Sequence, residues 1–398
     1  MIDSIKEELR LLRGIGWWYL TILLVPILRK TMFNRARNMN EFDKVDGSAS
    51  IAILFTVISL YVVVTKWQVI KGFFGENKTF VYYHIFCIFS ILWAGFSSAP
   101  IIGYKAVEVL ASYLFVILLL NKIQDIQDCF RFILSLLSIL NVIFLLKIHG
   151  HNNVFPLLGI TQFLLTLGAI RYKIFRYKQM QHHIAISVLT IIIGTSTASW
   201  LSLIIGLLFF WGTRHKGINV VAIIIVATLF YIIWNVFEDS IFHIIFGNKS
   251  ADEIRTGTGR QGLWEAYLKG WQESPILGHG FIVGEKGAIA SKYILFATNT
   301  SHNMMISVLI NTGIIGMVLW LRFLWKQCRI CWENSLVENP YALICFPAII
   351  AMFINANSFP VIGSEWSPIS PPIYALIIFI FSFVPNYQKE EKNEDSIL

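Results

Sequence analysis

Long apolar runs, separated by short polar connections, recur along most of this 398-residue chain. Each run is continuously apolar rather than alternating, which is typical of helices and not of the strands of a membrane barrel. About 17–25 apolar residues are needed to cross a hydrocarbon core of about 30 Å, and some of these runs are shorter. We therefore predict an all-α, polytopic membrane protein of about 12 transmembrane helices. The candidate runs are 15–28, 48–65, 80–98, 101–120, 130–147, 154–171, 184–196, 198–212, 218–235, 301–325, 340–358 and 366–384.

One connection, residues 236–300, is far longer than the others and mixes charge, glycine and aromatic residues. Loops of that length are usually functional or disordered. Basic residues gather in other, short connections, which the positive-inside rule assigns to the cytoplasm, so 236–300 is predicted to be a large extracytoplasmic loop. The predicted organisation is about nine N-terminal spans in 1–235, the loop 236–300 with the catalytic residues, three C-terminal spans in 301–384 and a cytoplasmic tail 385–398. The first 50 residues stay open, because the basic stretch 29–47 does not fit a simple count of spans.

Composition agrees with a membrane protein and excludes other classes. Only 14% of the residues are charged, against about 25% in soluble domains. The net charge of +8 is carried largely by basic residues beside apolar runs. That placement is typical of a membrane protein, so we expect no binding of nucleic acid.

The long loop contains a segment with amphipathic helical spacing, with apolar or aromatic side chains at positions such as 263, Trp264, 267 and 271. The pattern predicts a helix on the membrane surface with its aromatic residues at headgroup depth. Arg260 stands at the start of this helix and Arg255 lies close to it in the sequence. A guanidinium and a helix N-terminus can both face an anion, although a solvated loop arginine is the alternative.

Chemistry is also expected where the loop meets the next apolar run. His302 is followed by Asn303, and Gly313 and Gly316 lie about three turns further on. A neutral imidazole can accept a proton near physiological pH, and an amide can orient it or a substrate hydroxyl. The glycines would let another helix approach closely. The alternative is a polar cap on an ordinary helix.

Other polar residues near the runs have weaker claims. Glu365 precedes the last span on the predicted outer side, where a carboxylate can support a histidine or bind a sugar hydroxyl. Lys105 and Glu108 are three residues apart and are expected to pair. Several histidines lie at the ends of runs and are interpreted as interfacial rather than as metal ligands, so no metal site is predicted. These are His149, His151, His182, His183 and His215.

Taken together, these motifs resemble the bacterial O-antigen ligase and O-antigen polymerase superfamily. His302, Asn303, Gly313 and Gly316 match its H-[NSQ]-x9-G-x-x-G pattern. Gly259-Arg260 with Trp264 resembles the G-R-x-x-x-W stretch of polymerase-like members, and 274–280 resembles the N/S-P-x-x-G-x-G that follows it. In one respect the chain departs from the family: Thr197 stands after Ser196, where members often carry Arg or Lys.

The resemblance implies a glycosyltransferase in the bacterial inner membrane. Its donor would be a glycan on undecaprenyl diphosphate, and its acceptor would be another glycan or lipid A–core. Membrane lipid would surround the protein as a further partner. The resemblance implies that the enzyme uses no metal and no nucleotide sugar. It also implies a displacement that inverts the configuration at the transferred sugar. In this scheme His302 and Arg260 are catalytic, and the substrate is bound by Arg255, Asn303, Glu365, Trp264 and Lys286.

Two choices stay open. Polymerisation of O-antigen or exopolysaccharide repeats is favoured over ligation to lipid A–core by the Gly-Arg and Ser-Pro stretches. A flippase or transporter of the lipid-linked sugar is the alternative of another class, although no internal repeat supports it.

Overall fold

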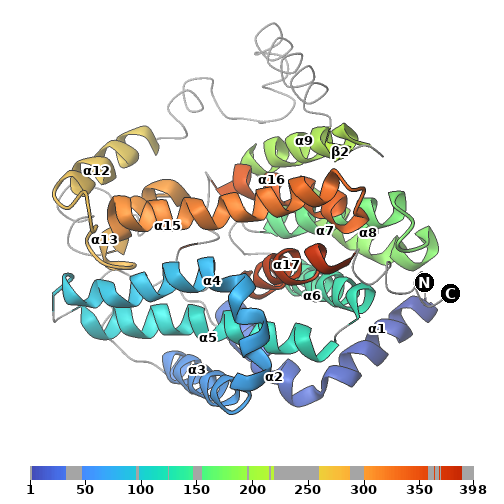
Figure 1. The fold of residues 1–398 in the computed structure, drawn as a ribbon, viewed down its shortest axis with the longest axis horizontal. Helices are drawn as coiled ribbons and strands as arrows, with labels where there is room; N and C mark the ends of the chain where they lie inside the picture. The colour runs from blue at the N-terminus through green and yellow to red at the C-terminus, as the bar shows by residue number, and fades with distance from the viewer. Residues whose placement is uncertain are drawn as a thin grey trace, which may run out of the picture.

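The apolar runs that lie in the described part of the chain form helices in the computed structural model (Figure 1). The structure describes residues 2–32, 47–95, 98–123, 125–146, 155–194, 197–214, 217–218, 260–286, 300–356, 363, 367 and 369–387. The run 218–235 falls outside these residues except for its first position. The helices are α1 (Ile2–Ile15), α2 (Trp17–Met32), α3 (Gly47–Thr65), α4 (Trp67–Phe89), η2 (Ser90–Leu92), α5 (Ala99–Ile123), α6 (Ile126–Leu146), α7 (Phe155–Arg171), α8 (Tyr177–Ile193), α9 (Thr197–Gly212), α12 (Arg260–Gln272), α13 (Val283–Lys286), α15 (Met304–Ser335), α16 (Pro340–Ala356), α17 (Ser370–Ser382) and η3 (Val384–Asn386).

Within the described residues, strand structure is confined to one short hairpin. Its strands, β1 (Thr213–Arg214) and β2 (Gly217–Ile218), pair antiparallel directly after α9. The expected helix in the long loop is also present, as α12, which extends three residues before the amphipathic stretch. The prediction of a helical protein is therefore confirmed.

Helix α17 forms the centre of the bundle. All of its residues are buried, and it contacts α4, α5, α6, α15 and α16 (Figure 1). A helix that is apolar on every side belongs in an interior rather than at a surface. Large apolar side chains on the outer helices, such as Leu54, Val57 and Val318, are exposed instead. An exposed apolar exterior is what a lipid-facing surface requires.

Three described helices, α5, α6 and α15, are long and apolar enough to cross a membrane. Two bent pairs pass the same test when each is taken together: α1 with α2, bent by 100°, and α3 with α4, bent by 95°. The number of helices that are both long and apolar enough to cross a membrane indicates a multi-pass membrane protein. The count of about 12 spans and the large loop stay predictions, since much of 218–300 lies outside the described residues.

The expected bounds of one run near the N-terminus were wrong. A span was expected over 80–98, but α4 begins at Trp67 and ends at Phe89. Hydropathy alone misplaced its start, because the polar residues of 71–79 continue the same helix. Before α2, the charged residues form α1, a separate amphipathic helix that breaks at Gly16, where φ is +102°.

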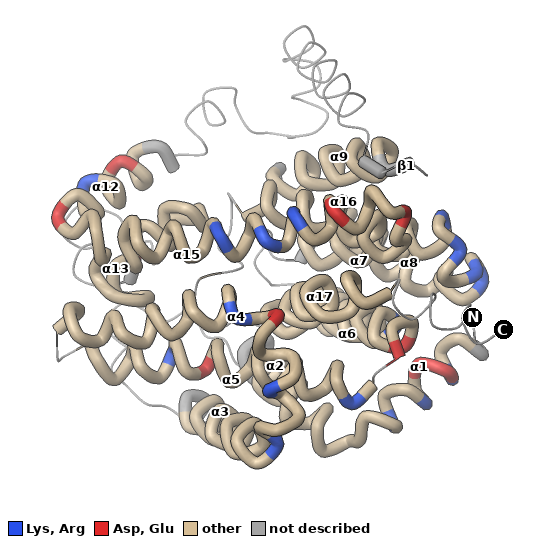
Figure 2. The backbone as a smooth tube through the Cα atoms, viewed as in Figure 1, with Lys and Arg blue, Asp and Glu red and all other residues tan. Residues whose placement is uncertain are grey.

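Charge is distributed unevenly between the two ends of the bundle. Basic residues at the start of α8 and in the second half of α15 lie toward the end that holds the start of α1 (Figure 2). Helices α12 and α13 lie at the opposite end, beside the first turns of α15 (Figure 1). Under the positive-inside rule the basic end would face the cytoplasm and α12 and α13 the outside, and this orientation stays a prediction.

Candidate functional site

The histidine predicted to be catalytic lies in a tight turn directly before α15. His302 has φ of +52°, an uncommon backbone conformation for a residue other than glycine, and its side chain is half-buried. Asn303 is the N-cap of α15, and its Oδ1 accepts hydrogen bonds from the backbone N–H groups of Met305 (2.9 Å) and Ile306 (3.2 Å). The cap fixes where the helix begins, and therefore where His302 stands.

A buried carboxylate, Glu285 of α13, holds this turn in place. Only 3% of Glu285 is exposed. Its Oε1 accepts hydrogen bonds from the backbone N–H of Ser301 and from the hydroxyl of Thr300, at 3.1 Å. Its Oε2 accepts from the hydroxyl of Ser307, at 2.6 Å. The two residues before His302 and the first turn of α15 are thus joined to one carboxylate.

The backbone of Glu285 is fixed as well. Its N–H donates to Oδ1 of Asn311 at 3.0 Å, and its carbonyl accepts from the hydroxyl of Tyr267 at 3.1 Å. Burial raises the pKa of Tyr267 above its ordinary value, and the negative charge of Glu285 adds to the shift. The phenol therefore remains a proton donor. Tyr267 belongs to α12, so this bond also ties α12 to α13.

A second hydrogen bond joins α12 to residues 300–303, the histidine turn. The indole Nε1 of Trp264 donates to the carbonyl of Ser301 at 2.9 Å. One turn deeper, Tyr267 packs against Ile310 of α15. Trp264 lies one helical turn after Arg260, the first residue of α12. The helix that carries the predicted catalytic arginine is therefore docked on the residue preceding His302.

The two motif glycines of α15 have different roles. At Gly313 the helix is interrupted, with φ of +63° and ψ of −164°, a combination open essentially to glycine. A Cβ at Gly313 would lie 2.3 Å from the carbonyl oxygen of Ile276. Gly316 lies against Phe86 of α4, as expected for a glycine that permits close helix packing.

The loop 275–280 fills the interruption at Gly313. The N–H groups of His279 and Gly280 donate to the carbonyls of Ile310 and Asn311, both at 2.9 Å. On the other side of the break, the N–H groups of Ile314 and Ile315 donate to carbonyls of the same loop. These bonds replace those that the helix loses, which matters because unpaired backbone groups are costly away from water. The Ser-Pro…Gly motif and the His-Asn…Gly motif thus form one structure.

The remaining predicted site residues are only partly described. Arg260 and Lys286 are placed by their backbones, at the start of α12 and the end of α13, and their side chains lie outside the description. Arg255 and Glu365 lie outside the described residues altogether. Gly363, two residues before Glu365, packs against Val308 and Trp320 of α15. Of the predicted set, the structure brings together His302, Asn303 and Trp264.

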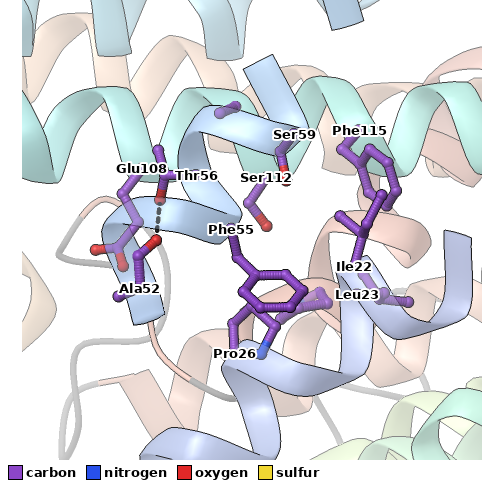
Figure 3. Close-up of a pocket in the computed structure, with 12 residues that line it drawn as sticks. Ile22, Leu23, Pro26, Ala52, Phe55, Thr56, Ser59, Glu108, Ser112 and Phe115 are labelled. Carbon is purple, nitrogen blue, oxygen red and sulfur yellow. Dashed lines mark hydrogen bonds between the residues drawn. The ribbon is translucent and has the colours of Figure 1, made fainter. Parts of the chain in front are cut away.

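The predicted pair Lys105 and Glu108 is confirmed, with 2.9 Å between Nζ and Oε2. The hydroxyl of Tyr104 also donates to Glu108, at 3.0 Å. Glu108 lines a small pocket between α2, α3 and α5, beside Thr56 and Ser112 (Figure 3). The cavity volume of about 30 Å³ leaves room for roughly two water molecules and excludes a sugar. This pair is therefore structural.

Sequence reasoning did not select Glu285. Gly284, Lys286 and Gly287 around it are typical of a solvated loop, and no periodicity marks Glu285 as buried. Its importance comes from partners up to 26 residues away in the sequence.

Comparison with known proteins covers the part of the chain that holds this candidate site. Residues 183–321 match the model of the protein family described as O-antigen ligase. The match runs from α8 to the part of α15 beyond Gly316, and so includes α12, α13 and the histidine turn. It confirms the resemblance to the O-antigen ligase and polymerase superfamily. No curated protein matches the chain.

Proposed function

We propose that the chain is a glycosyltransferase that moves a glycan from undecaprenyl diphosphate to an acceptor hydroxyl at the outer face of the inner membrane. The favoured reaction is polymerisation of O-antigen or exopolysaccharide repeat units. The family match supports a function of the ligase or polymerase type. Donor, acceptor and the choice between the two reactions are part of the proposal.

The observation that carries the proposal is the docking of α12 on the histidine turn. The Trp264–Ser301 and Tyr267–Glu285 hydrogen bonds hold the helix that begins at Arg260 against the turn that ends in His302. A cation at the start of α12 and an imidazole at the start of α15 would then serve one substrate. Helix α12 also lies at the end of the bundle away from the start of α1 (Figure 1), which suits an extracytoplasmic site if the basic residues near α8 face the cytoplasm.

The chemistry assigned to these residues is an in-line displacement with inversion. The acceptor oxygen attacks the anomeric carbon of the donor while the bond from that carbon to the diphosphate oxygen breaks. His302 takes the acceptor's proton or orients its hydroxyl. Arg260, with Arg255 and Lys286 as further cations, stabilises the negative charge that develops on the lipid diphosphate. These cations would also replace the one that family members carry at the position of Thr197.

Substitution of the two catalytic candidates tests the proposal. We expect His302→Ala and Arg260→Ala to abolish glycan transfer in membranes supplied with lipid-linked repeat units, while membrane insertion is retained. Arg329→Ala is the matched control, because Arg329 is exposed in the second half of α15 and pairs with Glu333. The control should transfer at the wild-type rate. Full activity in both test variants would refute the assignment.

Two further experiments separate the alternatives. In a knockout strain, short capped chains on the lipopolysaccharide indicate loss of a polymerase. Long chains stranded on undecaprenyl diphosphate indicate loss of a ligase. Movement of the lipid-linked sugar across vesicles that lack acceptor would favour a flippase instead.

A further inference from the structure

A polar cluster at the opposite end of the bundle from α12 joins the first helix to the rest of the molecule. Glu8 of α1 lies against His182 and His183 of α8, 174 residues away, and all three side chains are largely or fully buried. Figure 1 shows α1 starting beside α8, at the end of the molecule away from α12 and α13. The cluster is therefore separate from the proposed transfer site.

The distances suit a shared ion. Oε1 of Glu8 lies 2.7 Å from Nε2 of His182 and 3.0 Å from Nε2 of His183. One ligand atom from each residue can be chosen so that all lie within 4.8 Å of one another. In a zinc tetrahedron with bonds of about 2.1 Å, ligand atoms stand about 3.4 Å apart, so Oε1 would have to move roughly 0.7 Å away from Nε2 of His182 and roughly 0.4 Å away from Nε2 of His183.

The imidazole of His183 is oriented by groups behind it. Its Nδ1 lies 2.7 Å from Oγ of Ser138, which also accepts a hydrogen bond from Nε2 of Gln162. The amide Nε2 of Gln162 also lies 3.1 Å from Nδ1. In the tautomer that carries its proton on Nδ1, the hydroxyl oxygen of Ser138 accepts the hydrogen bond from Nδ1, and the lone pair of Nε2 faces Oε1 of Glu8. Outer groups of this kind fix the tautomer of histidines that bind metals.

The carboxylate of Glu8 is held in place by a group on α6. The hydroxyl of Ser135 donates to Oε2 of Glu8 at 3.0 Å, which leaves Oε1 toward the two imidazoles. The adjacent Glu7 pairs with Arg131 at 2.9 Å, so that arginine is engaged away from Glu8. Either a proton on Nε2 of His183 or a metal ion can join this nitrogen to Oε1 of Glu8, 3.0 Å away.

We propose that Glu8, His182 and His183 bind a divalent transition-metal ion, Zn²⁺ in particular. Two imidazoles and one carboxylate are a donor set that suits zinc, with one position left for water. The ion fastens α1 to α6 and α8, because Ser135 and Ser138 of α6 support its ligands. Its role is structural, since it stabilises the position of the N-terminal helix without contact with the transferred glycan.

Metal titration of the purified protein tests this proposal. The full chain is prepared in detergent without a polyhistidine tag, treated with a chelator, and titrated with Co²⁺ and then Zn²⁺. We expect one equivalent of Co²⁺ to give visible d–d absorption that Zn²⁺ removes. Saturating Zn²⁺ should raise the midpoint of thermal unfolding by several degrees, because it binds the folded state alone. Wild-type protein that binds no stoichiometric ion would refute the site.

Variants locate the ion. Glu8→Gln keeps the size of the side chain and its bond to Ser135 but removes the charge, and His182→Gln changes the less buried imidazole. Both should lose the cobalt spectrum and the thermal shift. Glu7→Gln is the matched control, one residue away, and should keep both. Equal binding by Glu8→Gln and wild-type protein would show that these residues hold no metal, and that hydrogen bonds alone dock α1.

Discussion

Replacement of Glu285 should misplace the histidine turn and reduce glycan transfer, although Glu285 is not assigned a chemical step. Its carboxylate accepts hydrogen bonds from Ser301, Thr300 and Ser307. In Glu285→Ala the two hydroxyls can rotate toward other acceptors, but the N–H of Ser301 is fixed by the backbone. One charge-assisted bond is lost and one buried donor is left unpaired, which together cost about 2–4 kcal/mol.

Glu285→Gln is a milder change with a different expected cost. The amide oxygen can still accept from Ser301, and the hydroxyl of Ser307 can turn to accept from the amide nitrogen. We expect a loss of about 1–2 kcal/mol, because only the charge and part of the geometry are removed. If His302 shifts by about 1 Å, transfer should fall about 100-fold in the alanine variant, and by less in the glutamine variant.

The assay pairs thermal unfolding in detergent with glycan transfer in membranes, measured on the same preparations. The control is Glu265→Gln, which removes a carboxylate from the exposed face of α12. The midpoint of thermal unfolding and the transfer rate should both be highest in the wild type, lower in the glutamine variant and lowest in the alanine variant. An alanine variant that unfolds at the wild-type temperature and transfers at the wild-type rate would refute the role of Glu285.

Two further predictions concern the start and the interruption of α15. Gly313→Ala should lower the free energy of unfolding by at least about 1–3 kcal/mol through the backbone conformation alone. Its Cβ would also clash with Ile276. The control is Gly262→Ala in α12, where a Cβ meets nothing within 4 Å, and it should be nearly neutral in thermal unfolding. Equal midpoints for the two would contradict the described break. Asn303→Ala should lose about 0.5–2 kcal/mol of N-cap stabilisation, and Asn303→Asp should restore the unfolding midpoint but not transfer, since the amide is assigned to the substrate. If aspartate restores both, Asn303 is a helix cap and nothing more.

The relation between the two motifs required the tertiary structure. The spacing of His302, Asn303, Gly313 and Gly316 gave the family, and amphipathic spacing gave α12, but neither places the loop 275–280 inside the break at Gly313. That arrangement depends on backbone hydrogen bonds between segments about 35 residues apart. The spacing of glycines indicates where a side chain would not fit, but it does not indicate which segment of the chain packs against each glycine.

The sequence by itself determined the helical membrane class, most helix positions and the Lys105–Glu108 pair, whereas the role of His302 stays a prediction. These follow from local rules, because apolar runs, helical periodicity and three-residue spacings act within a few turns of chain. Tertiary structure decided that Glu285 is a buried clamp and that Glu8 meets His182 and His183. Burial and meeting across 174 residues arise only when whole helices pack, so a charged residue in a polar segment reads the same whether it ends in solvent or in the core.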